Sequence, residues 1–309
     1  MLSFRAAAFN ALLRATIKKT WKPDMDVALM RRNMSVVTAL CRRSAEYSTL
    51  TTPGGPVDLI AANAHDDESL ILLYLHGGAF SLHSPPMYRG FVTRVCQHIG
   101  ASSGYLLDYR LAPEHQYPAA VNDCIETYRW LLEQPGVDPQ RLVLAGDSAG
   151  GSLTMTTLMQ ARDQGLPLPA CAVLISPFTN ATGTGSSIKE NEEHDVLFTP
   201  DALKAVLNWY LPESVDPTDP LISPLLGDVQ GLPPMLFQVG STEMLRDDSV
   251  QMAEKIVQSG GVADLKIWDD MPHVFQVIPW LPESDQALQQ LAAFVQKHTT
   301  ISLESNTSV

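Results

Sequence analysis

The sequence contains few cysteines and no long apolar run, and each shortage excludes a class of protein. Its 4 cysteines are Cys41, Cys96, Cys124 and Cys171, and no two of them form a C-x-x-C pair. We therefore expect reduced thiols rather than a disulfide framework or a metal site. No apolar stretch approaches the roughly 18 residues that a transmembrane helix requires, so no membrane span is expected.

Basic residues are also in the minority, with 21 Lys and Arg against 34 Asp and Glu, a net charge of −13. An acidic protein offers no positive field to hold phosphates, so nucleic acid is not an expected partner. Residues 1–19 are the exception, because they are basic, lack acidic residues and are amphipathic. Arg5, Asn10 and Arg14 interrupt the apolar stretch that a secretory signal needs. A helix on the protein's own core is the favoured interpretation, with a cytoplasmic location, and an organellar transit peptide is the alternative.

Apolar runs and helical patterns alternate from about residue 70 to 296, within a chain that is 45% hydrophobic. This alternation predicts an α/β fold with a mostly parallel sheet and helices on both faces. The runs interpreted as fully buried strands are Ser69–His76, Ser103–Asp108, Arg141–Ala145, Ala170–Ile175, Met235–Val239 and Leu265–Trp268. The helical patterns lie near Tyr88–Ile99, Pro118–Glu133, Gly151–Gln164, Asp247–Gln258 and Asp285–His298.

Two segments depart from the alternation and predict a second structural unit. Residues 1–45 have helical character and precede the first predicted strand. Residues 181–219 form an insert that is first polar, then acidic, and then carries an amphipathic helix at Pro200–Tyr210. We expect 1–45 and 181–219 to form a helical cap over the carboxyl edge of the sheet. Residues 46–180 and 220–309 then form the main domain; the alternative is that the two segments are unrelated surface additions.

The most informative motif is Gly146-Asp147-Ser148-Ala149-Gly150, which follows four apolar residues and precedes a helical pattern. It matches the G-x-S-x-G nucleophile elbow, a strand-to-helix turn that exposes the serine oxygen above the sheet. Ser148 is therefore the candidate nucleophile of an acyl-transfer reaction.

A serine hydroxyl needs a base, and that base needs an orienting acid. In a parallel sheet, functional groups gather at the carboxyl ends of strands. Of the 8 histidines, His273 follows the last predicted strand and comes after the serine in the chain. His273 is therefore the predicted base.

Two residues that follow the strand Met235–Val239 are candidates for the acid. Glu243 lies four residues beyond this strand, where it is expected to reach His273. Asp247 and Asp248 lie where the next helix begins, so their expected role is to cap that helix and to complement its dipole. Glu243 is favoured, with Asp247 as the alternative.

Backbone amides for an oxyanion are expected from two places. His76-Gly77-Gly78-Ala79-Phe80 follows a buried strand and is similar to the HGGG-type loop that supplies such donors. Gly78 and Ala79 are the expected donors of this loop, and their neighbour Gly77 is included with them in the expected oxyanion hole. Ala149 is expected to supply the amide of the elbow, and His76 to brace the loop.

A third motif, Asp108-Tyr109-Arg110-Leu111-Ala112-Pro113-Glu114-His115, extends the resemblance. With the two motifs above, in this order, the chain resembles the hormone-sensitive-lipase-like esterases from about residue 70 to 294. The resemblance implies an α/β-hydrolase fold with a helical cap, and a carboxylesterase that uses Ser148, His273 and an acid at position 243. Ala79 departs from the usual third glycine, and Glu243 from the more frequent aspartate. The family also implies structural roles for Asp108, Arg110 and Glu114, and a homodimer.

We expect a small ester with a short or medium acyl chain as the substrate, and neither a metal nor an organic cofactor. The pocket is expected to include Phe80, Leu82, Tyr210 and Phe275, although each apolar side chain fits ordinary core packing equally well. An amidase, formamidase or dehydratase on the same scaffold is an alternative. A non-catalytic ligand receptor is another, and the presence of His273 speaks against it.

Overall fold

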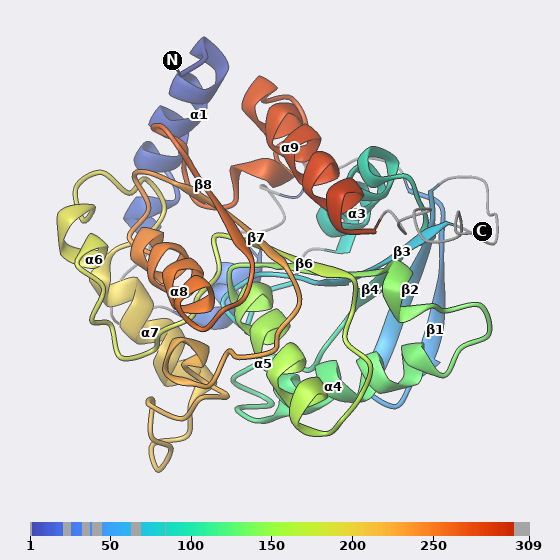
Figure 1. The fold of residues 1–309 in the computed structure, drawn as a ribbon. Helices are drawn as coiled ribbons and strands as arrows, with labels where there is room; N and C mark the ends of the chain where they lie inside the picture. The colour runs from blue at the N-terminus through green and yellow to red at the C-terminus, as the bar shows by residue number, and fades with distance from the viewer. Residues whose placement is uncertain are drawn as a thin grey trace.

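The computed structural model describes residues 2–20, 26–32, 38, 45–62, 69–83 and 85–299. A sheet of 8 strands forms its middle layer, in the order β1-β2-β4-β3-β5-β6-β7-β8 (Figure 1). The strands are β1 (Tyr47–Thr52), β2 (Gly55–Ala61), β3 (Leu70–Leu75), β4 (Ala101–Leu107), β5 (Leu142–Asp147), β6 (Cys171–Ile175), β7 (Met235–Gly240) and β8 (Ala263–Trp268).

The direction of the strands places the loops that carry the motifs at one edge. β3 runs parallel to β4 and β5, and β5, β6, β7 and β8 continue the parallel arrangement. Only β2 is antiparallel to its neighbours β1 and β4. The predicted mostly parallel α/β sheet is confirmed, and the residues that follow β3, β5, β6, β7 and β8 all leave the sheet at its carboxyl edge.

Helices cover both faces of the sheet and enclose two apolar cores. In Figure 1, α3 (Pro85–Ile99) and α9 (Pro282–Thr299) lie above the sheet, whereas α4 (Ala119–Leu132), α5 (Ala149–Asp163) and α8 (Arg246–Gln258) lie below it. Short 3-10 turns are η2 (Pro139–Arg141), η3 (Pro224–Leu226) and η4 (Phe275–Val277). Each predicted helix in this part of the chain is present, with ends that differ by a few residues.

Two strand predictions were wrong or incomplete. The hairpin of β1 and β2 was not predicted, and it extends the sheet beyond β4. The run Leu265–Trp268 does form a strand, but it is not fully buried as predicted. β8 is one of the two edge strands of the sheet, and Leu265 and Ile267 are each 37% exposed. An edge strand has a neighbour on one side alone, so its apolar side chains are only partly covered.

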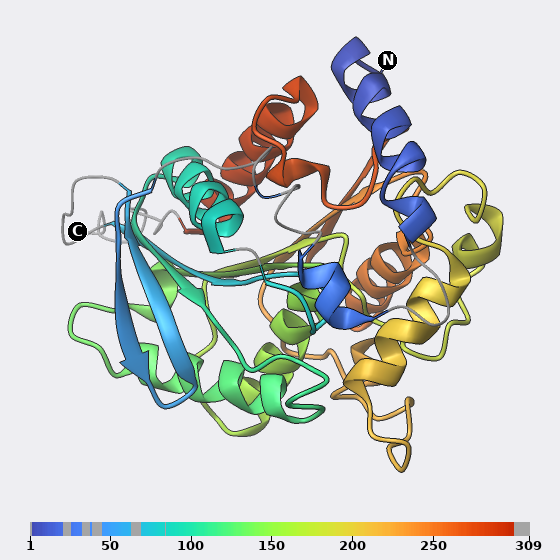
Figure 2. The ribbon, with the colours of Figure 1, turned by 180° about the vertical axis from the view of Figure 1, so that it is seen from behind.

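The two segments that interrupt the alternation lie side by side (Figure 2). The first contains α1 (Phe4–Ala15), η1 (Lys18–Thr20) and a helical stretch at 27–32, and the second contains α6 (Ser187–Glu190) and the predicted helix α7 (Pro200–Tyr210). Arg14 donates to the carbonyl of Glu193 at 3.0 Å, and Lys18 donates to that of Glu192. Residues 21–25, 33–37 and 39–44 of the predicted cap lie outside the described residues.

The cysteines and the helix lengths bear on the expected absence of disulfides and of a membrane span. Cys96, Cys124 and Cys171 are buried thiols that form no disulfide among the described residues, and Cys41 lies outside those residues. Among the residues that the structure describes, no helix combines the length and apolar character needed to cross a bilayer.

Candidate active site

Ser148 lies in a tight turn between β5 and α5, as the sequence predicts. Its backbone has φ 52° and ψ −118°, a conformation that side-chain-bearing residues rarely adopt. A Cβ on Gly146 would lie 2.3 Å from the carbonyl oxygen of Gly150, and one on Gly150 would lie 1.9 Å from that of Leu75. Only glycine fits either position, so the two glycines are what allow the strand to turn so sharply into the helix.

His273 and Glu243 meet at this edge although they follow different strands. His273 Nδ1 lies 2.7 Å from Glu243 Oε2, and the Glu243 side chain is fully buried. The other carboxylate oxygen of Glu243 accepts from the Ser176 hydroxyl at 2.7 Å and from the Gly240 amide at 2.5 Å. Both oxygens of the carboxylate are therefore held, and its position fixes the orientation of the imidazole.

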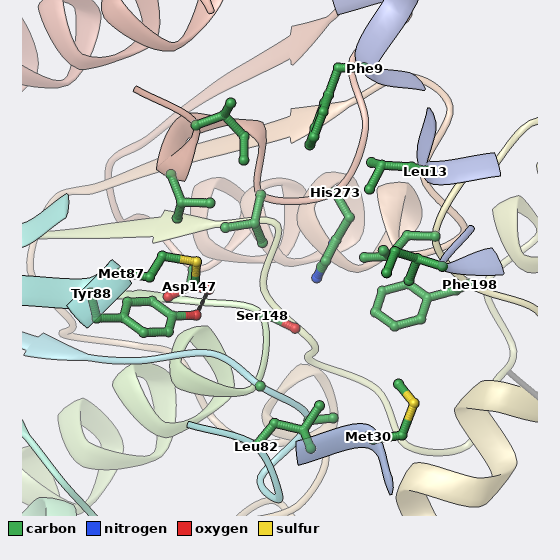
Figure 3. A pocket seen from close by; sticks show the side chains of 17 residues that line it. Phe9, Leu13, Met30, Leu82, Met87, Tyr88, Asp147, Ser148, Phe198 and His273 are labelled. Carbon is green, nitrogen blue, oxygen red and sulfur yellow. Dashed lines mark hydrogen bonds between the residues drawn. The ribbon is translucent and has the colours of Figure 1, made fainter. Parts of the chain in front are cut away.

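The second ring nitrogen of His273 faces the serine. Figure 3 shows the imidazole directed toward the hydroxyl of Ser148 inside one pocket. His273 Nε2 is buried and has no hydrogen-bond partner among the described residues. Because Nδ1 is engaged by Glu243, a neutral ring carries its free lone pair on Nε2. This is the nitrogen that a general base must present.

The charges around His273 favour its protonated form. Burial is the largest single influence and lowers the pKa of the imidazole, whereas the negative charge of Glu243 and the hydrogen bond to it raise that pKa. The charges of Asp195 and Asp147 act in the same direction, so the pKa of His273 lies above its ordinary value. A proton taken from Ser148 would therefore be stabilised on the ring.

The loop after β3 presents two of the three amides expected from it. Gly78 and Ala79 line the pocket with φ angles of 119° and 56°, and neither amide donates to another described residue. Ala149 begins α5, where the first amides of a helix have no intrahelical acceptor. The expectation for Gly77 was wrong, because its amide donates to Asp147 Oδ1 at 2.9 Å.

Asp147, which the sequence analysis left without a role, holds this loop. Its carboxylate accepts from the hydroxyls of Tyr74 and Tyr88, each at 2.8 Å, as well as from Gly77. Burial raises the pKa of the Asp147 carboxyl above its ordinary value, although its three hydrogen bonds oppose the shift. Its place beside Ser148 in the elbow motif was a signal that it acts near the site.

Two further residues position the groups around His273. Ser176, at the end of β6, donates to Glu243, and its oxygen accepts from the Val274 amide at 3.3 Å. Asp195 accepts from Met244 through one oxygen and from the amides of Leu197 and Phe198 through the other. Asp195 thus ties the insert to the loop that carries Glu243. No local motif in the sequence marks either residue.

One cluster of described residues has the composition of a metal site. The ligand atoms of His76, His83 and Asp108 lie within 4.8 Å of one another. However, the two imidazoles are stacked, with centroids 4.0 Å apart and planes inclined by 5°, so their in-plane lone pairs do not converge on one point. His76 Nδ1 is already engaged by the Gly77 carbonyl, and His83 Nδ1 by the Asp108 carboxylate. The geometry suits a brace behind the loop better than a metal centre.

The structure divides the four predicted pocket residues into two groups. Leu82 lines the pocket that contains His273, and Phe80 lines a second, smaller cavity beside Ser148. Tyr210 lies behind Phe80, with the two rings stacked and their centroids 3.8 Å apart, and it lines neither cavity. Phe275 is fully buried and packs edge-on against Trp268, so its expected contact with substrate was wrong. Its neighbours Val274 and Val277 line the pocket instead.

For Asp247 and Asp248 the predicted N-capping role was wrong, but both lie in the first turn of α8, where an acidic residue complements the helix dipole as predicted. Neither caps α8, whose N-cap residue is Leu245. Asp247 accepts from the Ser186 hydroxyl and the Ser187 amide, at 2.9 and 3.0 Å, and Asp248 accepts from the amides of Thr179 and Asn180. Both carboxylates therefore hold the start of the insert against α8.

Residues of the third motif, 108–115, form ion pairs around this site. Arg110 makes a close ion pair with Asp123 at 2.6 Å. Glu114 pairs with Arg31 at 2.6 Å, which joins the motif to the N-terminal segment. Asp108 contacts His83 at 2.8 Å. These contacts agree with the structural roles that the resemblance implies for Asp108, Arg110 and Glu114.

Comparison with known proteins places the chain among ester hydrolases. Residues 72–277 match a family described as having the alpha/beta hydrolase fold. An esterase of Acinetobacter venetianus is 33% identical over 291 residues, which cover 92% of this chain and 94% of that protein. An acetyl-hydrolase of Streptomyces hygroscopicus is 41% identical over 229 residues, which cover 74% of this chain and 76% of that protein.

A solved structure agrees with the sequence matches. An esterase from the bacterial hormone-sensitive lipase family superimposes with a TM-score of 0.89 and is 35% identical. The match covers 97% of this chain and 99% of that chain.

Proposed function

The chain belongs to the α/β-hydrolase fold family, among the hormone-sensitive-lipase-like serine carboxylesterases. We propose that it cleaves short- to medium-chain acyl esters with a triad of Ser148, His273 and Glu243. The observation that carries the triad is the arrangement of His273. One ring nitrogen is bound by a buried carboxylate, and the other is unpaired and directed at Ser148.

In the proposed mechanism, His273 Nε2 takes the proton of Ser148 as its oxygen attacks the ester carbonyl. The amides of Gly78, Ala79 and Ala149 stabilise the negative charge that develops on the carbonyl oxygen. His273 then protonates the departing alcohol, which leaves an acyl group on Ser148. Water activated by the same imidazole attacks this acyl-enzyme and releases the acid. Glu243 keeps the ring in the productive tautomer and stabilises its charged form.

The N-terminal segment and the insert form a cap over this site in our proposal. Leu13 and Met30 from the first segment and Phe198 from the insert line the pocket together with Ser148 and His273. Arg31 fixes the N-terminal segment through Glu114 and through the carbonyls of Ser81 and Ala112. The cap excludes water from the reacting carbonyl and supplies apolar surface to the substrate.

Matched esters and amides test the proposed reaction. We expect the protein to hydrolyse 4-nitrophenyl acetate at least about 10³ times faster than 4-nitroacetanilide, because 4-nitrophenolate is a good leaving group, whereas the anilide nitrogen must be protonated by His273 before it departs. Initial rates of 4-nitrophenol and 4-nitroaniline release provide the measurement. Equal or faster cleavage of the anilide would favour an amidase on the same scaffold.

The expected homodimer and cytoplasmic location stay predictions from the sequence.

A further inference from the structure

Two cavities of unequal size meet at Ser148. The larger has a volume of about 160 Å³ and the smaller about 20 Å³. Ser148, Ala79 and Phe198 line both of them. His273 lines the larger cavity, and Ala149 lines the smaller. The two cavities therefore lie on different sides of the point where a substrate carbonyl would be attacked.

The chemistry of the triad assigns each half of an ester to one cavity. The attacked carbon carries the acyl chain, the leaving oxygen, the oxyanion and the oxygen of Ser148. The leaving oxygen must lie within hydrogen-bond reach of His273 Nε2 in order to receive its proton. The alcohol half therefore extends into the cavity that His273 lines. The acyl chain points away from the imidazole, into the cavity that Ala149 lines.

The smaller cavity, which receives the acyl chain, has only a small volume. Its volume of about 20 Å³ compares with the roughly 10–15 Å³ that a single water molecule needs by the same kind of measure. Its walls are closely packed, because the rings of Phe80 and Tyr210 are stacked with centroids 3.8 Å apart and Phe80 makes an edge contact with Phe178. Leu203 and Val206 of α7 close the opposite side. A methyl group fits this space, and a longer chain does not.

The alcohol cavity is large and apolar. A dry engineered cavity of roughly 150 Å³ holds a benzene molecule, so a volume of about 160 Å³ accommodates a six-membered ring. In Figure 3, Phe9, Leu13, Met30 and Leu82 surround the open space. The polar side chains at its wall are those of Ser148 and His273 and the pair of Tyr88 and Asp147, which are hydrogen-bonded to each other at 2.8 Å.

We propose that the preferred substrates are acetyl esters of bulky, apolar alcohols or phenols, which narrows the acyl range of the proposed function to its shortest member. This inference rests on the proposed triad, because the position of His273 decides which cavity receives which half.

Two substrate series separate the halves. With 4-nitrophenol as the constant leaving group, we expect kcat/KM to fall at least about tenfold from the acetate to the butyrate, since each methylene that a pocket cannot accommodate reduces kcat/KM about tenfold or more. With acetate as the constant acyl group, kcat/KM is expected to rise at least about tenfold from the methyl to the benzyl ester, because a ring buries apolar surface. Proton release measured at constant pH follows the second series.

A pair of variants tests the assignment itself. Val206→Ala enlarges the acyl cavity, so the butyrate-to-acetate ratio of kcat/KM is expected to rise about tenfold while the benzyl-to-methyl ratio changes less than about twofold. Leu13→Phe fills the alcohol cavity, so the benzyl-to-methyl ratio is expected to fall about tenfold while the butyrate-to-acetate ratio is retained. Circular dichroism and thermal unfolding verify that both variants are folded.

The outcomes distinguish this inference from the proposed function. If wild-type protein prefers the butyrate, or if the two variants exchange their effects, the assignment of the cavities is overturned while ester hydrolysis stands. If no ester of either series is hydrolysed, the proposed function itself has failed.

Discussion

Replacing Ser148 with alanine is expected to reduce kcat/KM for 4-nitrophenyl acetate roughly 10⁵- to 10⁶-fold, because loss of the nucleophile removes the covalent route. The residual rate would come from the remaining amide donors and from substrate binding. Initial rates with purified protein measure this effect, with an active-site titration that excludes contamination by wild-type enzyme. Stability is expected to change little, since alanine adopts the same backbone conformation as serine.

Ser152→Ala is the matched control for this prediction. Ser152 is also buried, lies one helical turn further along α5, and lines neither cavity. We expect it to retain activity within a few-fold of wild type. If Ser148→Ala keeps more than about 1% of wild-type activity, or if Ser152→Ala loses as much, Ser148 is not the nucleophile.

Replacing Glu243 with alanine is expected to lower kcat about 10³- to 10⁴-fold, because the imidazole loses its orientation and its charge partner. Asp247→Ala is the matched control, since Asp247 was the alternative acid. Its hydrogen bonds to Ser186 and Ser187 hold the insert, so its loss is expected to lower the free energy of unfolding by about 1 kcal/mol and to leave kcat within about tenfold. Equal loss of kcat in both variants would contradict the assignment of the acid.

The pH dependence of Glu243→Gln separates orientation from charge. The reaction needs a neutral His273, so kcat/KM of the wild type is expected to fall as the pH drops below a pKa that lies above the ordinary histidine value. Glutamine removes the negative charge that raises this pKa. The acidic limb of the profile is therefore expected to move to lower pH in the variant, while the plateau falls. An unmoved limb would show that Glu243 does not contact the titrating group.

The positions of the candidate site residues could be predicted from the sequence because most of them lie in or beside short local motifs. The elbow around Ser148 needs two glycines and a strand-to-helix transition, and both are visible in the order of residues. His273 and Glu243 were found through one topological rule, that parallel strands bring their carboxyl ends to one edge. The structure brings these three residues together, although they are far apart in the sequence and no repeating pattern relates their positions.

The predictions that were wrong concern contacts between distant residues. An amide such as that of Gly77 is a potential donor in any glycine-rich loop, and only the fold reveals that Asp147 occupies it. Phe275 has the same apolar character as Val274, yet the turn η4 directs one into the core and the other toward the pocket. Likewise, the exposure of β8 follows from its position at the edge of the sheet, which depends on the order of all eight strands.

The central claim, that His273 activates Ser148 for nucleophilic attack, is tested most directly by covalent labelling with diethyl 4-nitrophenyl phosphate. Digestion and mass spectrometry then locate the label. The peptide that contains Ser148 also contains Ser152, and fragmentation distinguishes the two. We predict one diethylphosphoryl group per chain, on Ser148, with activity lost in proportion, and at least about 10³-fold slower labelling in His273→Ala. Inactivation with the label on any other residue, or unchanged labelling of His273→Ala, would contradict the account.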